Sequence, residues 1–235
     1  METNNEFFSL ENNDNVLFLT MNAPGNNIMT SDFLDEFEKT IEILEKKYKE
    51  DKNIKGLVIR GGGRHFSVGA DVPSLVQRTS ESKGYISSKE ELPESHTDQK
   101  HAFTVLHDMP FPVISVVTGY CIGSGSEIAV NSHIRICETN ARAGQPESTF
   151  GILPALGGIT RTIDICGFSK AVDLVFSGEL FTADKAGEYN WADIVCDKKK
   201  GLETAVSLID HINSRGTGYD ISSVPEYISE FNKRG

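Results

Sequence analysis

Two strand–turn–helix units limit the fold of this chain more than any other feature of its sequence. In the first, an apolar strand over 55–60 runs through the glycine-rich turn 61–71 toward a short helix. In the second, a strand over 113–118 leads through the turn 119–125 into another helix. Strands that alternate with helices in this way are typical of a sheet covered by helices. The chain is therefore predicted to have an α/β fold.

Hydrophobic periodicity predicts the remaining elements. Thr30 or Ser31 can cap a helix whose apolar stripe recurs at helical spacing and comprises Phe33, Leu34, Phe37, Ile41 and Leu44. The other expected elements are strands over 15–21 and 133–137 and helices near 72–77, 125–130, 158–166, 169–176 and 202–213. We expect these units to form a coil of related layers, although the sequence shows no strict repeat.

The charge and the apolar pattern exclude several classes of function. The net charge of −11 disfavours binding to nucleic acid or to anionic membranes, because both need clustered Lys and Arg. The most apolar segment, 111–130, is interrupted by one proline, three glycines and a glutamate, so a membrane span of about 20 residues is not expected there. Residues 1–15 lack the pattern of a secretory signal, which favours a cytoplasmic location.

The cysteine spacing gives no sign of a metal site or a disulfide framework. Cys121, Cys137, Cys166 and Cys196 are far apart, and no CxxC pair occurs among them. Reduced thiols packed in the interior are the simpler interpretation, and no metal or separate cofactor is predicted.

A polar stretch over 79–100 separates the two strand–turn–helix units. It contains many charges, serines, a glycine and a proline, which indicates an exposed loop. Two interpretations stay open for this loop. It is either a lid over a ligand or a surface insertion without a function.

The two glycine turns are candidates for binding negative charge. Gly69-Ala70-Asp71 and Gly123-Ser124-Gly125 each stand where a helix is expected to begin, and the first N–H groups of a helix have no partner within it. If one N–H group from each turn meets at a carbonyl oxygen, the pair can stabilise an enolate. Because a single glycine turn is weak support, the acidic residues nearby must agree with this hypothesis.

Two glutamates are the candidate acids, and each has an alternative explanation. Glu127 falls in the first turn of the expected helix, where a carboxylate is favoured by the helix dipole alone. Glu147 lies between a Gly-Gln-Pro segment and another turn, where an acidic side chain is usually just solvated. Neither glutamate by itself indicates catalysis.

An ordered series of motifs extends over roughly Asn15 to Cys196. The motifs are Met21-Asn-Ala-Pro24, His65-Phe-Ser-Val-Gly-Ala-Asp71, Pro112-Val-Ile-Ser-Val-Val-Thr-Gly-Tyr120, Gly123-Ser-Gly-Ser-Glu127, Gly144-Gln-Pro-Glu147, Gly151-Ile-Leu-Pro-Ala-Leu-Gly-Gly158 and Ser177-Gly178. This series as a whole, and not one motif, resembles the crotonase family, also called the enoyl-CoA hydratase/isomerase superfamily.

The resemblance implies a fold, a site and an activity. The fold would be a crotonase-like spiral of ββα turns, and the N–H groups of Ala70 and Ser124 would form the oxyanion hole. Glu127 and Glu147 would be the catalytic acid/base pair of a lyase that adds water to a 2-enoyl thioester. The backbone of Ser67, Val68, Gly69 and Ala70 would contact coenzyme A, which enters as part of the substrate in fatty acid metabolism.

Three departures from the family pattern affect what the resemblance implies. Ser124 stands where glycine is usual, but only its N–H is needed. His133 stands where an aspartate is common, and we expect it to pack at a strand end. Only about 35 residues follow Gly201, so we divide the chain into a core domain over 1–200, which carries the active site, and a shortened C-terminal helical segment over 201–235. The expected homotrimer or hexamer of the family is a weaker inference for that reason.

Competing functions stay open at this point. The same scaffold supports isomerisation of an enoyl-CoA, decarboxylation, or dehydration of a carrier-protein thioester. The presence of Glu127 favours hydratase chemistry, because isomerases commonly retain only the acid corresponding to Glu147. A function of another class, a non-catalytic relative that binds coenzyme A or RNA, is disfavoured by the complete pair of acids and by the acidic charge.

Overall fold

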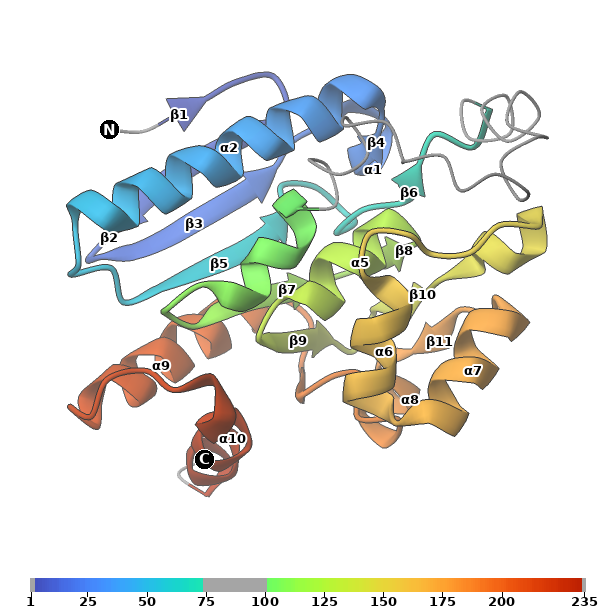
Figure 1. The fold of residues 1–235 in the computed structure, drawn as a ribbon. Coiled ribbons are helices and arrows are strands. Elements are labelled where there is room, and N and C mark those ends of the chain that lie inside the picture. Colours follow the sequence, from blue (N-terminus) through green and yellow to red (C-terminus); the bar gives the residue numbers. More distant parts are fainter. Residues whose placement is uncertain (1–2, 74–100, 234–235) are drawn as a thin grey trace, which may run out of the picture.

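A mostly parallel sheet forms the centre of the molecule (Figure 1). The computed structural model describes residues 3–73 and 101–233, and within them seven strands pair in the order β1-β2-β3-β5-β7-β9-β12. The first three strands are antiparallel, and β3 through β12 are parallel. The strands are β1 (Thr3–Asn4), β2 (Phe8–Asn13), β3 (Val16–Met21), β5 (Gly56–Gly61), β7 (Val113–Val117), β9 (Ile134–Glu138) and β12 (Ile194–Cys196).

The central strands are buried on both faces. Every residue of β3, β7 and β9 is buried. The sequences of β3 and β7 are almost continuously apolar instead of alternating, whereas β9 also contains the buried Arg135 and Glu138. Such strands need cover on both sides, which parallel sheets receive from the helices that connect them. The alternation of strands and helices in the sequence predicts an α/β fold, and the structure confirms that fold class.

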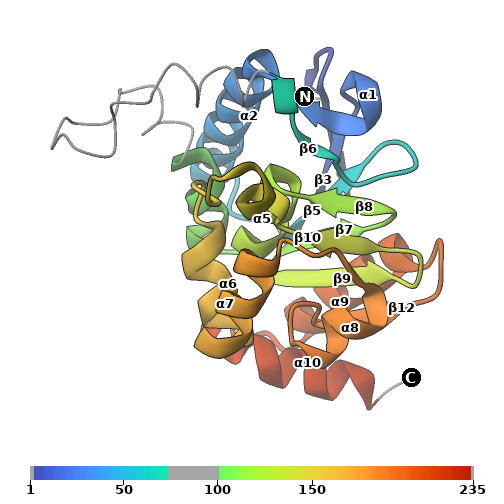
Figure 2. The same cartoon turned by 90° about the vertical axis from the view of Figure 1, so that its right-hand side faces the viewer.

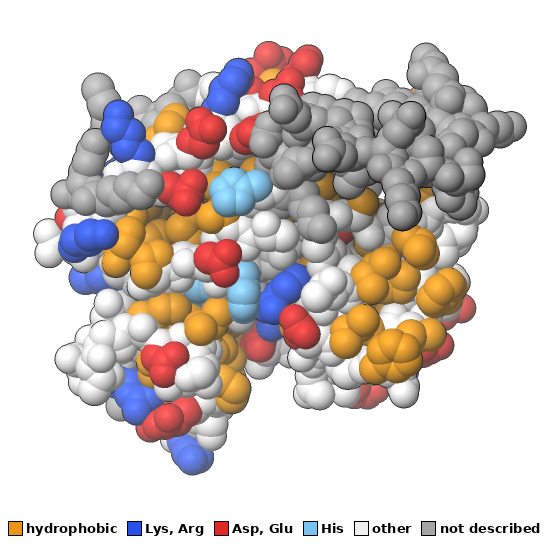
Figure 3. Space-filling model, in the orientation of Figure 1, with side chains coloured by type: hydrophobic (Ala, Val, Ile, Leu, Met, Phe, Trp, Pro, Cys, Tyr) orange, Lys and Arg blue, Asp and Glu red, His pale blue; other side chains and the backbone are white. Residues whose placement is uncertain are grey.

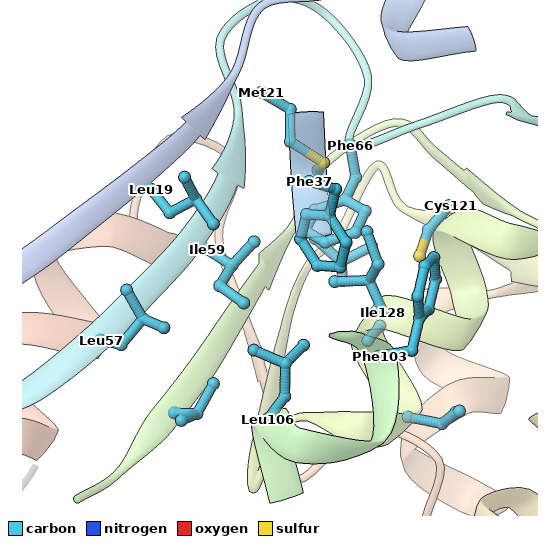
Figure 4. Close-up of a cluster of buried hydrophobic side chains, with 14 of the residues drawn as sticks. Leu19, Met21, Phe37, Leu57, Ile59, Phe66, Phe103, Leu106, Cys121 and Ile128 are labelled. Atoms are coloured by element: carbon cyan, nitrogen blue, oxygen red, sulfur yellow. The ribbon is translucent and has the colours of Figure 1, made fainter. Parts of the chain in front are cut away.

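Two separate hydrophobic clusters lie on the two faces of the sheet. Leu57 and Ile59 of β5 belong to one cluster, and Val58 between them belongs to the other, as the alternation of a strand requires. The first face is covered by α2 (Ser31–Glu50), and a cluster including Phe37 and Phe103 fills the space between (Figure 4). The second face is covered by α9 (Gly201–Ser214) and α10 (Val224–Asn232) (Figure 2).

Helix α2 follows the predicted pattern closely. The Thr30 hydroxyl oxygen accepts a hydrogen bond from the Phe33 N–H at 3.2 Å, which makes Thr30 the N-cap. Phe37 and Leu44 of the predicted stripe are fully buried, whereas Leu34 at its edge is partly buried. Burial of this stripe packs α2 against the first face of the sheet.

Smaller elements complete the structure and surround the glycine turns. A second sheet has the order β11-β10-β8, with β8 and β10 parallel, and a two-stranded sheet pairs β4 with β6. The strands are β4 (Ile28–Met29), β6 (Gly69–Ala70), β8 (Tyr120–Ile122), β10 (Arg142–Gly144) and β11 (Phe181–Thr182). The helices are α1 (Pro24–Asn27), α5 (Ser124–Asn131), α6 (Gly158–Cys166), α7 (Phe168–Ser177) and α8 (Ala183–Glu188), with short 3-10 helices η1 (Val105–Asp108), η2 (Pro146–Phe150) and η3 (Ile221–Ser223).

The structure differs from the prediction at both glycine turns. The segment 119–125 contains strand β8, which pairs with β10 and also forms a bridge from Cys121 to Ser67. Gly69 and Ala70 belong to β6, and helical residues begin only at Val72. Pairing with segments distant in the sequence converts both turns into short strands. The greater part of the predicted helix over 72–77 and the whole of the loop over 79–100 lie outside the described residues.

The C-terminal region contains α9 and α10, and α9 agrees with the helix predicted over 202–213. The division into a core of residues 1–200 and a segment of residues 201–235 stays a prediction. Of the helices within residues 3–73 and 101–233, none has the length and apolar character needed to cross a bilayer.

Candidate active site

Glu127 lies in the first turn of α5, and the glycine that precedes this helix has a positive φ. Gly123 has φ 54°, and its carbonyl oxygen accepts a hydrogen bond from the Glu127 N–H at 2.9 Å. The neighbouring Ile128 points into the core cluster, which fixes the rotation of the helix (Figure 4). Glu127 is only 2% exposed, so its carboxyl group is held inside the protein.

The Glu127 carboxyl group receives two backbone hydrogen bonds from one turn. Its Oε1 accepts from the Leu156 N–H at 2.7 Å and from the Gly158 N–H at 3.0 Å. Gly158 is the first residue of α6, so this oxygen also lies at the positive end of a helix. A Cβ on Gly158 would stand 2.7 Å from Oε1, so no larger residue fits without displacing the carboxyl group.

Glu147 lies beside Gly123, the residue that precedes α5. It lies in η2, which follows β10, and β10 is tied to the start of α5 by a hydrogen bond from the Gly123 N–H to the Gly144 carbonyl oxygen at 2.9 Å. A Cβ on Gly123 would stand 2.9 Å from Glu147 Oε1. The other oxygen, Oε2, is buried and has no hydrogen-bond partner among the described residues.

The pKa values of the two glutamates are both raised. Burial, and then the negative charge of Glu147, raise the pKa of Glu127 to about 8, although the two backbone donors act in the opposite direction. Burial raises the pKa of Glu147 to about 7. Because each ionised carboxylate opposes ionisation of the other, the two groups titrate as a pair. Near neutral pH this pair can both accept and deliver a proton.

The two predicted N–H donors lie on turns that pack against each other. Ser124 is the first residue of α5, where an N–H has no intrahelical partner. Ala70 is the last residue of β6, and the preceding Gly69 has φ 83°. A Cβ on Gly69 would stand 2.6 Å from the carbonyl oxygen of Ile122, so the β6 turn touches the chain just before α5. The structure thus brings the two turns together, as the hypothesis of an oxyanion hole requires.

Ser67 holds these turns in place through its side chain. It is fully buried, its hydroxyl donates to the Asn27 carbonyl oxygen at 2.7 Å, and its oxygen accepts from the Gly69 N–H at 3.0 Å. A Cβ on Gly125 would stand 2.7 Å from the Ser67 Cβ, which shows how closely α5 packs here. Contact of Ser67, Val68, Gly69 and Ala70 with coenzyme A stays a prediction, and it concerns their backbone.

Gln145 is a residue of this site to which sequence reasoning assigned no role. It is only 4% exposed, and its Nε2 has no hydrogen-bond partner among the described residues. A Cβ on Gly158 would stand 2.6 Å from this nitrogen and 2.7 Å from Glu127 Oε1, so the amide and the carboxyl group border the same space. The signal was its place beside Glu147 in the Gly-Gln-Pro-Glu motif.

His133 packs at the strand end, as the sequence indicates. Its Nδ1 lies 3.1 Å from the Val113 backbone N–H, which donates to it, and 2.8 Å from the Tyr219 hydroxyl oxygen. Its Nε2 lies 2.9 Å from the His107 carbonyl oxygen. Burial lowers the pKa of His133 to about 4, so the ring is neutral at physiological pH. A neutral ring that accepts at Nδ1 donates from Nε2, which links β7, η1 and the C-terminal region.

Metal-ligating groups do not gather in the described part of the chain. Within residues 3–73 and 101–233, no three His, Cys, Asp or Glu side chains are grouped closely enough to hold a metal ion. Cys121 and Cys137 are buried, and all four thiols are free.

Comparison with known proteins connects this geometry with a family. The family model described as enoyl-CoA hydratase/isomerase matches residues 11–219. The chain is similar to the fatty acid oxidation complex subunit alpha of Shewanella amazonensis, with 32% identity over 206 residues, and of Shewanella frigidimarina, with 31% identity over 199 residues. These alignments cover 86% and 83% of this chain but only 28% and 26% of the two relatives, so the chain spans less than a third of their length.

Solved structures share the fold at low sequence identity. An enoyl-CoA hydratase/carnithine racemase from Magnetospirillum magneticum aligns with a TM-score of 0.77 and 16% identity, over 99% of this chain and 82% of the other. DspI from Pseudomonas aeruginosa aligns with a TM-score of 0.71 and 22% identity, over 98% of this chain and 96% of the other. With the crotonase fold, the paired glutamates and a family match over almost its whole length, the chain belongs to the enoyl-CoA hydratase/isomerase family.

Proposed function

We propose that this protein is a hydratase-type lyase, which reversibly adds water in syn geometry across the double bond of a 2-enoyl coenzyme A thioester. One observation carries the proposal: the buried carboxyl group of Glu127, held by backbone N–H donors, interacts electrostatically with the partly buried Glu147, and the pKa values of both are raised. Hydration needs both a base for the water and an acid for the α-carbon. A pair that holds about one proton near neutral pH supplies both.

The negative charge of the intermediate would be stabilised by backbone N–H groups. When water attacks the β-carbon, the electron pair of the double bond moves toward the thioester carbonyl and forms an enolate. We assign its oxygen to the N–H groups of Ala70 and Ser124, the predicted oxyanion hole. Donors of this kind contribute about 2.7–4 kcal/mol each to the transition state.

The different surroundings of the glutamates suggest how they divide the work. Glu127 Oε1 accepts two backbone hydrogen bonds at the start of α6, which stabilise an ionised carboxylate, whereas Glu147 Oε2 has no partner among the described residues. We assign removal of the water proton to Glu127 and delivery of a proton to the α-carbon to Glu147. Deeper burial opposes this order by favouring a proton on Glu127. In the dehydration direction the two roles are exchanged.

The substrate carrier is proposed from the family and from the local backbone. Coenzyme A would bind along Ser67, Val68, Gly69 and Ala70 through main-chain contacts, which need no basic side chain on a chain with a net charge of −11. The similarity to the fatty acid oxidation complex subunit alpha of two Shewanella species suggests fatty acid oxidation as the pathway. No cofactor besides the coenzyme A of the substrate is proposed, and a cytoplasmic location stays a prediction.

Turnover of a thioester panel tests this proposal. The purified protein is incubated with enoyl-, 3-hydroxyacyl- and carrier-protein thioesters, and gain or loss of water is followed by mass spectrometry. We expect Glu127→Gln and Glu147→Gln each to lower the rate by about 10²–10⁴, while Glu188→Gln, at an exposed position, has no effect.

The outcomes separate the competing functions. Full activity in both glutamine variants would contradict the mechanism. A shift of the double bond without gain of water, retained in Glu127→Gln, would identify an isomerase. Absence of turnover on every thioester would support a non-catalytic relative that binds coenzyme A.

We also propose a homo-oligomer, a trimer or a hexamer, held partly through α7. Phe168, Val172 and Phe176 recur every four residues on this helix, and Phe168 and Phe176 are 69% and 67% exposed. Figure 3 shows apolar side chains gathered over this part of the molecule. Exposed apolar patches of this kind mark contact surfaces. Phe168→Asp combined with Phe176→Asp should reduce the mass measured by light scattering to that of a monomer, and an unchanged mass would exclude this face.

A further inference from the structure

Asn131, the last residue of α5, connects two parts of the chain that support Glu127. It is 1% exposed, and its Nδ2 donates to the Glu127 carbonyl oxygen at 2.8 Å and to the Leu156 carbonyl oxygen at 3.0 Å. The first bond stays within the helix. The second reaches 25 residues along the chain, to the turn that supplies N–H donors to the Glu127 carboxyl group.

These bonds form a closed ring around Glu127. The Leu156 N–H donates to Glu127 Oε1, the Leu156 carbonyl oxygen accepts from Asn131, and Asn131 also donates to the Glu127 backbone carbonyl oxygen. The ring of bonds thereby fixes the position of the Glu127 carboxyl group relative to the backbone of Glu127 itself. Gly157 lies against the amide, since a Cβ there would stand 3.1 Å from Asn131 Nδ2 and 3.1 Å from Oδ1.

We propose that Asn131 is a positioning residue for Glu127, which fixes the turn 156–158 so that its N–H groups hold Glu127 Oε1 and leave the other oxygen for the reacting water. The inference rests on the proposed function of Glu127 as a base. It adds a residue that touches neither substrate nor water and acts only through the turn.

The use of the amide distinguishes this role from ordinary capping of a helix end. Capping needs one bond to a carbonyl of the last turn, which Asn131 makes to Glu127, but it does not need the bond to Leu156. Oδ1 is buried and has no partner among the described residues, so the side chain serves here as a donor. The opposite amide orientation would place Oδ1 against two carbonyl oxygens, which is unfavourable.

Titration of the Glu127 carboxyl group tests this role without using activity. Protein labelled with ¹³C at the glutamate carboxyl carbons is titrated by NMR, and Glu127→Gln identifies the Glu127 signal. The backbone donors at Leu156 and Gly158 lower the Glu127 pKa. Loss of the hydrogen bond from Asn131 to Leu156 should weaken these donors, so Asn131→Ala should raise the Glu127 pKa by roughly half a unit to one unit. We also expect kcat to fall about 5- to 10-fold with KM little changed.

Ser132→Ala is the matched control. Ser132 is the adjacent, equally buried residue, but its hydroxyl faces Ser115 at 2.7 Å and the Ile128 carbonyl oxygen at 3.1 Å, away from the turn. It should leave the Glu127 titration unchanged. Asn131→Ser is the milder variant, because its hydroxyl can still bond the carbonyl four residues earlier but is too short to reach Leu156. It should shift the titration in the same direction as Asn131→Ala.

Each result decides between two accounts. A Glu127 titration in both Asn131 variants equal to that of the unaltered protein overturns the proposal, and so does an equal shift in Ser132→Ala. A shifted titration in a protein that hydrates no thioester overturns the proposed function and leaves the positioning of Glu127 by Asn131 intact.

Discussion

The two glutamates of the site are held by very different structures. Glu127 projects from α5 toward the start of α6, and both backbone donors bind one of its carboxyl oxygens. Glu147 lies in a short 3-10 helix whose next residues become exposed, and its Oε2 has no partner among the described residues. One carboxyl group is fixed, and the other is left with unused hydrogen-bonding capacity.

This contrast suits a reaction in which a proton crosses the site. The group that orients water gains from rigidity, because a misplaced base loses much of its rate advantage. The group that delivers a proton to carbon must hold that proton without a strong partner that would favour ionisation. The hydrogen bonds of each glutamate therefore match the role proposed for it, whereas the deeper burial of Glu127 acts in the opposite direction.

Of the comparisons between the two glutamates, a methyl group added beside each carboxyl group should change the rate most. In Gly158→Ala the new Cβ would stand 2.7 Å from the fixed Glu127 oxygen, and we expect a rate about 100-fold lower. In Gly123→Ala the Cβ would stand 2.9 Å from Glu147 Oε1, which has more freedom to move, so we expect a rate about 10-fold lower in the folded protein. The φ of 54° at this position also strains alanine, so the folded fraction is measured alongside the rate. Steady-state kinetics measures both rates. A larger loss in Gly123→Ala would reverse the comparison.

The pH dependence of the rate should show the shared proton. With pKa values raised to about 7 and about 8, the pair carries one proton only between these values. The hydration rate should therefore be highest there and should fall about tenfold for each pH unit well outside this range on either side. A rate that stays constant between pH 5 and pH 10 would exclude the pair as the acid and base.

The smallest expected effect concerns stability. Because the folded-state pKa values lie above the ordinary value of 4.5, the folded protein binds more protons than the unfolded chain between that value and about 8. The stabilisation of the folded protein by these bound protons is complete below pH 4.5 and is lost as the pH rises through the folded-state pKa values of about 7 and about 8. Glu127→Gln should therefore gain about 1–3 kcal/mol over the unaltered protein at pH 9, and Glu147→Gln somewhat less. Urea unfolding at pH 5 and pH 9 measures the difference.

Local signals made most of the fold predictable from the sequence. The helix predicted over 158–166 has the observed limits, and the cap at Thr30 is confirmed. The second sheet was missed because β8 and β10 are three residues long and pair only with distant segments. So short a strand has too few residues for periodicity to show.

The candidate site was predictable in its residues but not in its geometry. The motifs identify Glu127 and Glu147, and the structure places both beside the turn at Gly123. The donors at Leu156 and Gly158 are backbone groups, so side-chain identity gives no sign of them. Asn131 at a helix end looks like an ordinary cap until its bond to Leu156 is seen.

The most direct test of the central claim follows the oxygen and the hydrogen that are added across the double bond. A 2-enoyl coenzyme A thioester is incubated with the protein in ¹⁸O-labelled heavy water, and the product is analysed by mass spectrometry and NMR. We predict one ¹⁸O atom at the β-carbon and one deuteron at the α-carbon, added to the same face, with both lost in Glu127→Gln and Glu147→Gln. Deuterium in the product without ¹⁸O at the β-carbon would contradict hydration by this pair of carboxyl groups.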